Sequence, residues 1–295
     1  MVRPALAATR ALAVLDHFAA HPERSYSLSE LSTALDINAP SLLAVLRSLT
    51  DAGYLVRHPG RKTYGLGMSA VAAGHAALTR HRVVDRARHE LRALAAESGA
   101  AGVISAVAGE SIVILGVEGR PTTPEVWAGQ RLPLLPPLGQ VFLAWSGAGD
   151  IRRWLDRTAA GVPLPAHLDT ALAVVRERGW SAHRDTAART ALGATLAQLA
   201  DTPRDSELRT RVAESVLALG EDYELLEVAP RATYRLATLS APVFDQYGTV
   251  ALALTATGLP PLAGARVQEL AGRLTAVGRV LSQEIGGRPP VGSPG

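Results

Sequence analysis

The most informative part of the 295-residue chain is residues 27–55, SLSELSTALDINAPSLLAVLRSLTDAGYL. Ser27 and Glu30 have the Ser-x-x-Glu spacing of a capping box, in which each side chain bonds to the backbone of the other residue. This box predicts that a helix begins here and continues through Leu35, where the apolar periodicity stops. The segment 36–38 then breaks the pattern, as expected of a tight turn between two short helices.

A second helix is predicted from Pro40 to Ala52, because proline suits the first helical turn and Gly53 is a good residue for the end. Working outward, an amphipathic pattern predicts a helix at 9–20, and two strand-like runs flank a turn cluster at 58–61. Helix, helix, tight turn, helix and hairpin is the order of elements in a winged helix-turn-helix.

The predicted third helix has one apolar face and one face suited to reading DNA. Leu42, Val45, Leu46 and Leu49 share the apolar face. The opposite stripe contains Ser41, Leu43, Ala44, Arg47 and Ser48. Arginine can bond to guanine through two parallel hydrogen bonds, serine suits phosphates or base edges, and leucine can meet a thymine methyl. In a helix-turn-helix this stripe faces the major groove.

The predicted hairpin has a basic tip formed by Arg57, His58, Arg61 and Lys62, which suits phosphates or an adjacent minor groove. Taken singly, a surface arginine or a basic turn is more often only solvated. The ordered combination of helices, stripe and wing is what favours double-stranded DNA as a partner.

The remainder of the chain predicts an α+β domain with an antiparallel sheet, because hairpin patterns at 102–117 and 231–257 alternate with helical segments. We expect four parts: a winged helix-turn-helix at 1–67, one linker and dimerisation helix at 68–98, an effector-binding domain at 99–285 and a disordered tail at 286–295. A long helix without a partner helix of its own favours self-association as a homodimer or homotetramer.

Composition narrows the class of protein. Hydrophobic residues make up 47% of the chain, charged residues 19%, and the net charge is +3, so proper cores can form and disorder is excluded. There is no cysteine, no apolar run long enough to span a membrane and no signal-peptide pattern. We therefore expect a cytoplasmic protein without a membrane partner.

Catalytic and metal-binding patterns are absent from the sequence. There is no Gly-x-Ser-x-Gly elbow, phosphate-binding loop or dinucleotide fingerprint. Ser181, His183 and Asp185 are too close together to converge as a triad. His17 and His21 are spaced as metal ligands can be, but a third ligand is missing. The sequence predicts neither an enzyme nor a cofactor nor a metal site.

The chain resembles the IclR-type transcriptional regulators, in blocks that occur in order along nearly its whole length. The blocks are 28–35, 46–55, 64–67, 129–134, 138–145 and 241–248. The resemblance implies a winged helix-turn-helix, a linker helix, a GAF-like effector-binding domain, and dimers or tetramers on palindromic operators. It also implies that a small organic or aromatic acid is the effector, in a pocket near Gly139, Gln140 and Ser240.

Three departures from the family pattern stand out. The polar stretch usual at the start of the recognition helix is replaced by Pro40, Ser41, Leu43 and Ala44. Pro136-Pro137 stands where the family commonly has Thr-Ala, and the segment 181–235 is much longer than usual. Within it, 204–221 predicts an additional helix.

Two functions follow from these features. The first is a sequence-specific DNA-binding regulator that responds to a small-molecule effector. The alternative is a constitutive DNA-binding or protein-interaction module whose sensor pocket is filled by the additional helix and binds no ligand. An open or filled pocket beside Gln140 distinguishes the two.

Overall fold

The computed structural model describes residues 5–120, 126–157, 168–201, 205–220 and 223–290. Its contacts divide the chain into two units, Met1–Arg82 with Leu196–Arg209, and Val83–Thr195 with Thr210–Gly295. Within the described residues, no helix is both long enough and apolar enough to cross a bilayer.

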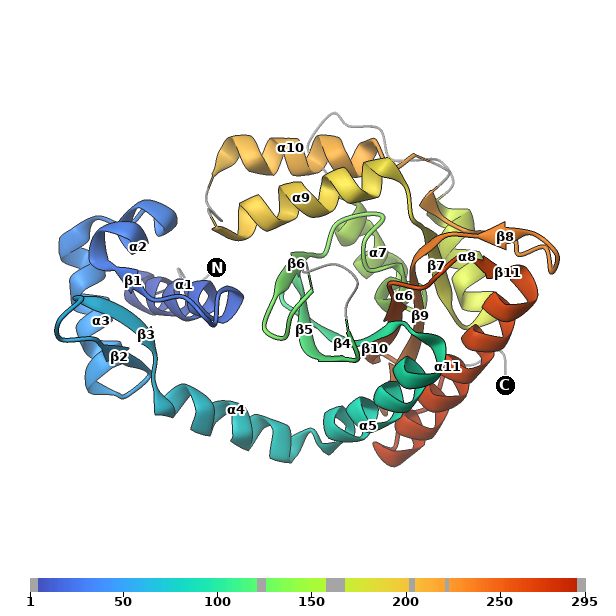
Figure 1. Ribbon diagram of the computed structural model, residues 1–295, viewed down its shortest axis with the longest axis horizontal. Helices are drawn as coiled ribbons and strands as arrows, with labels where there is room; N and C mark the ends of the chain where they lie inside the picture. Colours follow the sequence, from blue (N-terminus) through green and yellow to red (C-terminus); the bar gives the residue numbers. More distant parts are fainter. Residues whose placement is uncertain (1–4, 121–125, 158–167, 202–204, 221–222, 291–295) are drawn as a thin grey trace. The chain divides into compact units, whose positions relative to one another are not determined.

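The first unit contains the predicted winged helix-turn-helix (Figure 1). Its elements are α1 (Leu6–Ala20), β1 (Tyr26–Ser27), α2 (Leu28–Leu35), α3 (Ala39–Asp51), β2 (Leu55–Arg57), β3 (Thr63–Leu66) and α4 (Met68–Arg80). The strands form an antiparallel sheet in the order β1-β3-β2.

The helix boundaries follow from local hydrogen bonds. The Ser27 N–H donates to the Glu30 carboxylate at 2.7 Å, and the Glu30 N–H donates to Ser27 Oγ at 3.3 Å, so the predicted capping box is confirmed. Asn38 caps α3, because its Oδ1 accepts from the Ser41 N–H at 3.0 Å. Gly53 follows the end of α3 with φ +73°, a conformation that favours glycine.

A compact apolar core holds α1, α2 and α3 together. Its fully buried members include Phe18, Leu31, Leu42 and Leu46, which come from all three helices. Each such side chain contributes roughly 1.5–3 kcal/mol on burial. The apolar face predicted for α3 is therefore confirmed. The opposite face of the helix points away from this core.

The prediction of one continuous linker helix at 68–98 is wrong, because two helices occupy this range. Helix α4 ends at Arg80, His81 has non-helical angles of φ −110° and ψ 55°, and α5 spans Arg82–Ser98. The physical reason is burial. Helix α5 packs a strongly amphipathic face into the second unit, whereas no residue of α4 is buried.

The second unit is built on a six-stranded antiparallel sheet in the order β6-β5-β4-β10-β9-β7. The strands are β4 (Ala101–Ala108), β5 (Ser111–Glu118), β6 (Arg131–Pro133), β7 (Ser181–Arg184), β9 (Leu236–Phe244) and β10 (Val250–Thr257). The antiparallel sheet predicted from the hairpin patterns is confirmed. Strands β6 and β7, at its two edges, were not predicted.

The remaining described elements are helices and a small two-stranded ribbon. The helices are α6 (Gln140–Leu143), α7 (Ala148–Leu155), α8 (Leu168–Arg178), α9 (Ala187–Asp201), α10 (Ser206–Leu217) and α11 (Gly264–Glu284), and the ribbon pairs β8 (Thr233–Tyr234) with β11 (Leu262–Ala263). The additional helix predicted at 204–221 is confirmed as α10, while residues 204 and 221 lie outside the described residues. Helix α9 was not predicted.

Helices α5 and α6 cover opposite faces of the sheet. Leu91 of α5 lies against Gly102 of β4, where a Cβ would be 2.7 Å from the Leu91 side chain. Gly102 lies opposite Ala256 of β10. Ala253, which side-chain alternation places on the other face, packs in a cluster with residues of α6, including Phe142. Ser240, one of the residues predicted to lie near an effector pocket, is on this second face.

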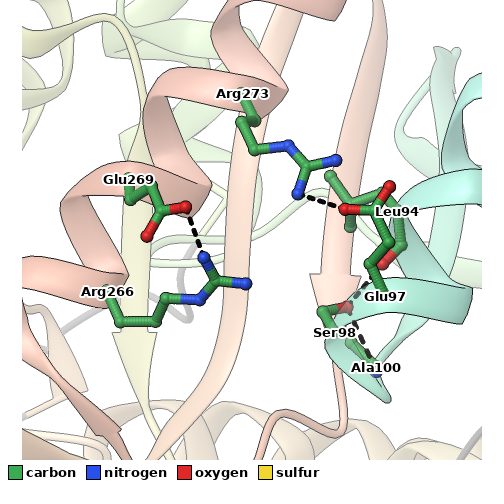
Figure 2. A network of polar contacts seen from close by, with 7 residues as sticks. All are labelled: Leu94, Glu97, Ser98, Ala100, Arg266, Glu269 and Arg273. Atoms are coloured by element: carbon green, nitrogen blue, oxygen red, sulfur yellow. Dashed lines mark hydrogen bonds and ion pairs between the residues drawn. The ribbon is translucent and has the colours of Figure 1, made fainter.

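Helix α11 runs antiparallel beside α5, held by charged pairs. Arg273 donates to Glu97 at 2.6 Å near the end of α5 (Figure 2). At the other end of the pair of helices, Arg86 lies 3.7 Å from Glu284. The Arg273 hydrogen bond lowers the pKa of the Glu97 carboxyl. These pairs hold α11 against α5, the helix that precedes strand β4.

The tail predicted as disordered from 286 is ordered over its first residues. The Gly287 N–H donates to the Ser282 carbonyl at 2.7 Å, and the Arg288 N–H donates to the Asp245 carbonyl at 3.3 Å. This part of the prediction is therefore wrong, because turn bonds anchor a Pro/Gly-rich segment. Residues 291–295 lie outside the described residues.

Candidate functional site

The outward face of α3 presents the residues predicted to read DNA. Ala44, Arg47 and Ser48 are exposed, and Ser41 and Leu43 are half-buried at the edges. Ala44 and Ser48 are three and seven residues from Ser41, and Arg47 is three residues from Ala44, so neighbouring members of the stripe lie side by side. The structure therefore brings the predicted stripe together on one surface.

Only part of this stripe has polar atoms available. The Ser41 N–H is used by the Asn38 cap, and Ser48 Oγ donates to the Ala44 carbonyl at 3.1 Å within the helix. Arg47 makes no ion pair or hydrogen bond with any residue that the structure describes. Its guanidinium group is thus the strongest donor that α3 offers to a partner.

The β2–β3 hairpin positions a basic tip. The His58 N–H donates to the Thr63 carbonyl at 2.8 Å, and the His58 ring lies 3.1 Å from the Arg61 N–H, which donates to its Nδ1. Lys62 takes a left-handed conformation with φ +55°. His58 therefore shapes the turn, while the side chains of Arg61 and Lys62 are exposed.

Arg57 precedes this tip on β2. Its guanidinium carbon lies 6.0 Å from the centre of the Tyr64 ring, at the outer limit of a cation–π contact. The side chain remains exposed, so it extends the basic surface along the strand. Exposed basic side chains therefore lie on both α3 and the hairpin, the two elements predicted to contact DNA.

In the second unit, Gly139 sets the start of α6. Its φ of +90° lies in the region that favours glycine, and a Cβ there would be 2.3 Å from Leu134 Cδ1. Its carbonyl accepts from the Phe142 N–H at 2.8 Å. The geometry gives Gly139 a structural role, because it turns the chain so that Gln140 points at the sheet.

Gln140 is buried and bonded to a residue far away in the sequence. Its Nε2 donates to Oε1 of Glu224, and only 2% of Gln140 and 5% of Glu224 are exposed. Glu224 comes shortly after α10, in a segment that pairs with β7: it lies opposite His183, and the Leu225 N–H donates to the Ala182 carbonyl at 3.0 Å. The position beside Gln140 is thus filled by this segment rather than by α10.

Ser240 belongs to a row of hydroxyl groups across three strands. The register aligns Ser181 of β7 with Ser240 of β9, and Ser240 with Thr255 of β10. Ser240 Oγ and Thr255 Oγ1 are 2.8 Å apart. Thr255 shares its face with Ala253, so the row lies on the side covered by α6.

A second polar row lies beside the first. His183 of β7 is opposite Thr238 of β9, and its Nδ1 lies 2.9 Å from Thr238 Oγ1. The Tyr223 ring stacks on His183 with centroids 4.6 Å apart. Burial, together with the charge of Arg178, lowers the pKa of His183 to about 3, so its imidazole is neutral.

Sequence reasoning missed most of this polar face. Thr238 and Ser240, and likewise Thr255 and Thr257, are spaced by two residues, and polar alternation within apolar strands was the available signal. Ser181, His183 and Asp185 do not converge as a catalytic triad. Asp185 is exposed, and its carboxylate lies 3.8 Å from Arg189.

Comparisons with known proteins agree with this arrangement. The IclR helix-turn-helix domain model matches residues 7–59, which span α1 to the hairpin tip. A relative, the HTH-type transcriptional regulator XynR of Escherichia coli K12, is 26% identical over 181 residues, covering 58% of this chain and 71% of XynR. Residues 7–59 thus match a helix-turn-helix domain of the IclR type.

Solved structures extend the likeness from this domain to the fold of nearly the whole chain. The IclR transcriptional regulator from Alicyclobacillus acidocaldarius has a TM-score of 0.67 and 21% identity, covering 95% of this chain and 99% of that one. An IclR homologue from Microbacterium hydrocarbonoxydans, crystallised with 4-hydroxybenzoate, has a TM-score of 0.63 and 15% identity, covering 94% and 99%. These likenesses concern the fold, including the antiparallel sheet of the second unit.

Proposed function

We propose that this IclR-type regulator binds specific double-stranded DNA through α3 and the hairpin tip, and that a small molecule bound in the second unit changes this binding. The observation that carries the DNA-binding part is the exposed Arg47, unpaired among the described residues, on a helix whose other face is buried. Arg61 and Lys62 add charge for the phosphate backbone.

The test is binding of the purified full-length protein to the DNA upstream of its own gene, measured over a range of salt concentrations. The expected result is saturable binding tighter than to random DNA of equal length, with affinity falling as salt rises. If genome-wide selection also recovers no preferred fragment, sequence-specific regulation is contradicted.

Self-association is the second part of the proposal. Helix α4 buries none of its residues, and Met68 and Val71 are 76% and 59% exposed. An apolar helix surface of this kind favours a second copy of the chain as its partner, giving a homodimer or homotetramer. Sedimentation of the wild type and of Val71→Asp tests it: the substitution is expected to shift the protein towards monomer.

A DNA-binding regulator with two such heads requires a way to change their arrangement. Effector binding on the α6-covered face of the sheet supplies it if the ligand has different affinities for two arrangements. Support for a ligand site comes from the buried polar face around Ser240 and Gln140. The IclR homologue crystallised with 4-hydroxybenzoate shares this fold.

One observation favours the alternative of a constitutive DNA-binding or protein-interaction module. The amide of Gln140 already has a protein partner in Glu224, so the position beside it is filled from within the chain. Under this alternative no small molecule changes the affinity for DNA. Screening metabolites for an effect on the protein–DNA complex separates the two functions. Cytoplasmic localisation stays a prediction under both.

A further inference from the structure

Three hydrogen bonds join the end of α3 to the start of α4 across the base of the hairpin. The Gly67 N–H donates to the Tyr54 carbonyl at 2.8 Å, and the Ser69 N–H donates to the Gly53 carbonyl at 3.0 Å. In addition, Ser69 Oγ donates to the Ala52 carbonyl at 2.8 Å. We call these five residues the α3–α4 junction.

The junction uses backbone groups that helices leave unsatisfied at their ends. The last carbonyls and the first N–H groups of a helix have no partner within it. Ala52 is the C-cap of α3, and Ser69 is the second residue of α4, so each helix end supplies partners for the other. The carbonyl end of α3 lies against the N–H end of α4, which is a favourable arrangement of helix dipoles.

Two glycines let the backbones of the junction approach each other closely. A Cβ on Gly67 would be 2.3 Å from the Gly53 carbonyl oxygen, and a Cβ on Gly53 would be 2.7 Å from Ser69 Oγ. Gly67 has φ −102° and ψ 173°, which any residue adopts, so the missing side chain is what matters there. Such close packing leaves little room for α4 to tilt against α3.

The rest of α4 is held much less firmly. Along this helix, which the structure describes completely, no residue is buried. It ends at His81, which has non-helical angles of φ −110° and ψ 55°, and the second unit begins at Val83. Segments with few buried contacts are those that move most easily, so we expect bending at His81 rather than at the junction.

We propose that Gly67 and Ser69 are positioning residues for DNA reading: they make α3 and α4 one rigid body, so that the direction of α4 sets the direction of α3. The inference rests on the proposed function, in which α3 contacts base edges and the second unit changes DNA binding. A rotation of α4 about His81 then reorients Arg47 on α3 instead of being lost in a flexible joint.

The first measurement is the distance between spin labels attached to Ala39→Cys on α3 and Ala77→Cys on α4 of the full-length protein. The chain has no native cysteine, and both alanines are exposed. Dilution with unlabelled protein restricts the signal to distances within one chain. A single narrow distribution is expected, and Gly67→Ala is expected to shift or broaden it, because the added methyl separates the two backbones.

Each test variant has a matched control on the same helix. Gly74→Ala is the control for Gly67→Ala, since nothing lies within 4 Å of the atom added at Gly74. Thr79→Ala is the control for Ser69→Ala, because Thr79 Oγ1 donates to the His75 carbonyl within α4 at 3.0 Å. Ser69→Thr keeps the hydroxyl, and we expect it to retain the wild-type distribution.

The second measurement is the ratio of affinities for the preferred DNA fragment and for random DNA, at a temperature where the variants are folded. A purely structural junction would change the unfolding midpoint and leave this ratio unchanged. Positioning predicts that Gly67→Ala lowers the ratio by at least about fivefold, as the loss of one base contact does. Ser69→Ala is expected to lower it less, because its hydroxyl bond is exposed.

Two results would overturn the inference: a label distribution that Gly67→Ala and Ser69→Ala leave unchanged, or an altered distribution with the wild-type affinity ratio. If Gly67→Ala does not fold, the comparison of Ser69→Ala with Ser69→Thr carries the test, and equal results for these two contradict the inference. A wild type that prefers no DNA fragment refutes the proposed function instead. The label distances then still decide whether the junction is rigid.

Discussion

The side-chain amide of Gln140 donates a hydrogen bond to the carboxylate of Glu224, 84 residues further along the chain, and both residues are buried. This contact joins the start of α6 to the segment that follows α10. It brings Glu224, from the segment 181–235, beside a residue of the proposed effector site. The segment therefore contributes a buried polar side chain to this part of the second unit.

The first prediction concerns the stability of this pair. Glu224→Ala leaves the Gln140 amide buried without that acceptor, and we expect it to lower the free energy of unfolding by about 1–3 kcal/mol. In the double variant Gln140→Leu/Glu224→Leu both polar groups are absent, so the loss is expected to be smaller than the sum of the two single losses. Denaturant unfolding measures this coupling, and strictly additive losses would contradict it.

A second prediction concerns the cap of the helix proposed to read DNA. Asn38→Ala removes the acceptor for the Ser41 N–H, and we expect a loss of about 0.5–2 kcal/mol in unfolding free energy. Asn38→Asp keeps an acceptor oxygen and serves as the control that retains most of the stability. Thermal unfolding of the three proteins is the measurement, and equal midpoints for all three would show that the cap contributes nothing.

A third prediction uses two glycines that both precede short helices. Gly139→Ala places a Cβ 2.3 Å from Leu134 Cδ1 at a φ of +90°, and we expect it to destabilise the protein by more than about 1 kcal/mol. Gly147→Ala is the control, because φ is −66° and nothing lies within 4 Å of the added atom. Chemical denaturation should separate the variants clearly. If both have the same stability, Gly139 is not constrained as described.

A fourth prediction concerns pH. Burial opposes ionisation of Glu118, but hydrogen bonds from Arg88 at 2.9 Å and Arg92 at 3.0 Å outweigh it and lower the pKa of this carboxyl. A lowered pKa stabilises the fold above the ordinary glutamate value of about 4.3, and the gain is lost as pH falls through the lowered pKa. In Glu118→Gln, the free energy of unfolding should therefore fall less steeply than in the wild type as the pH is lowered from neutral to acid.

The control for this measurement is Glu110→Gln, since Glu110 is exposed and only 3.7 Å from Arg157 in a surface pair. Its profile is expected to follow the wild type. The measurement is the unfolding midpoint of the wild type and of both variants at several pH values. A Glu118→Gln profile as steep as that of the wild type would show that another group is responsible.

The DNA-binding unit could be predicted closely because its signals are local. Ser27, Glu30 and Gly53 specify helix ends through hydrogen bonds and backbone angles within a few residues. The periodicity of α3 also separated buried Leu42 and Leu46 from exposed Arg47. Such information is contained in short stretches and does not depend on distant contacts.

The linker and the proposed effector site could be predicted only in part, because both depend on tertiary contacts. Nothing local marks His81 as a break, which arises where α5 begins to bury one face. Gln140 and Ser240 were selected from the family resemblance, but Glu224 lies 84 residues beyond Gln140, and no local pattern marks it as the partner of Gln140. Edge strand β7 is short, and pairing with β9 is what makes it a strand.

The proposal that α3 reads bases while the hairpin tip binds phosphates is tested most directly by comparing Arg47→Ala and Arg61→Ala on the preferred DNA fragment and on random DNA. We expect Arg47→Ala to lose about 1–3 kcal/mol on the preferred fragment and little on random DNA, so that selectivity falls. Arg61→Ala should weaken both equally and reduce the salt dependence by about one phosphate contact. Equal losses on both DNAs for Arg47→Ala, with selectivity intact, would contradict the assignment of base reading to α3.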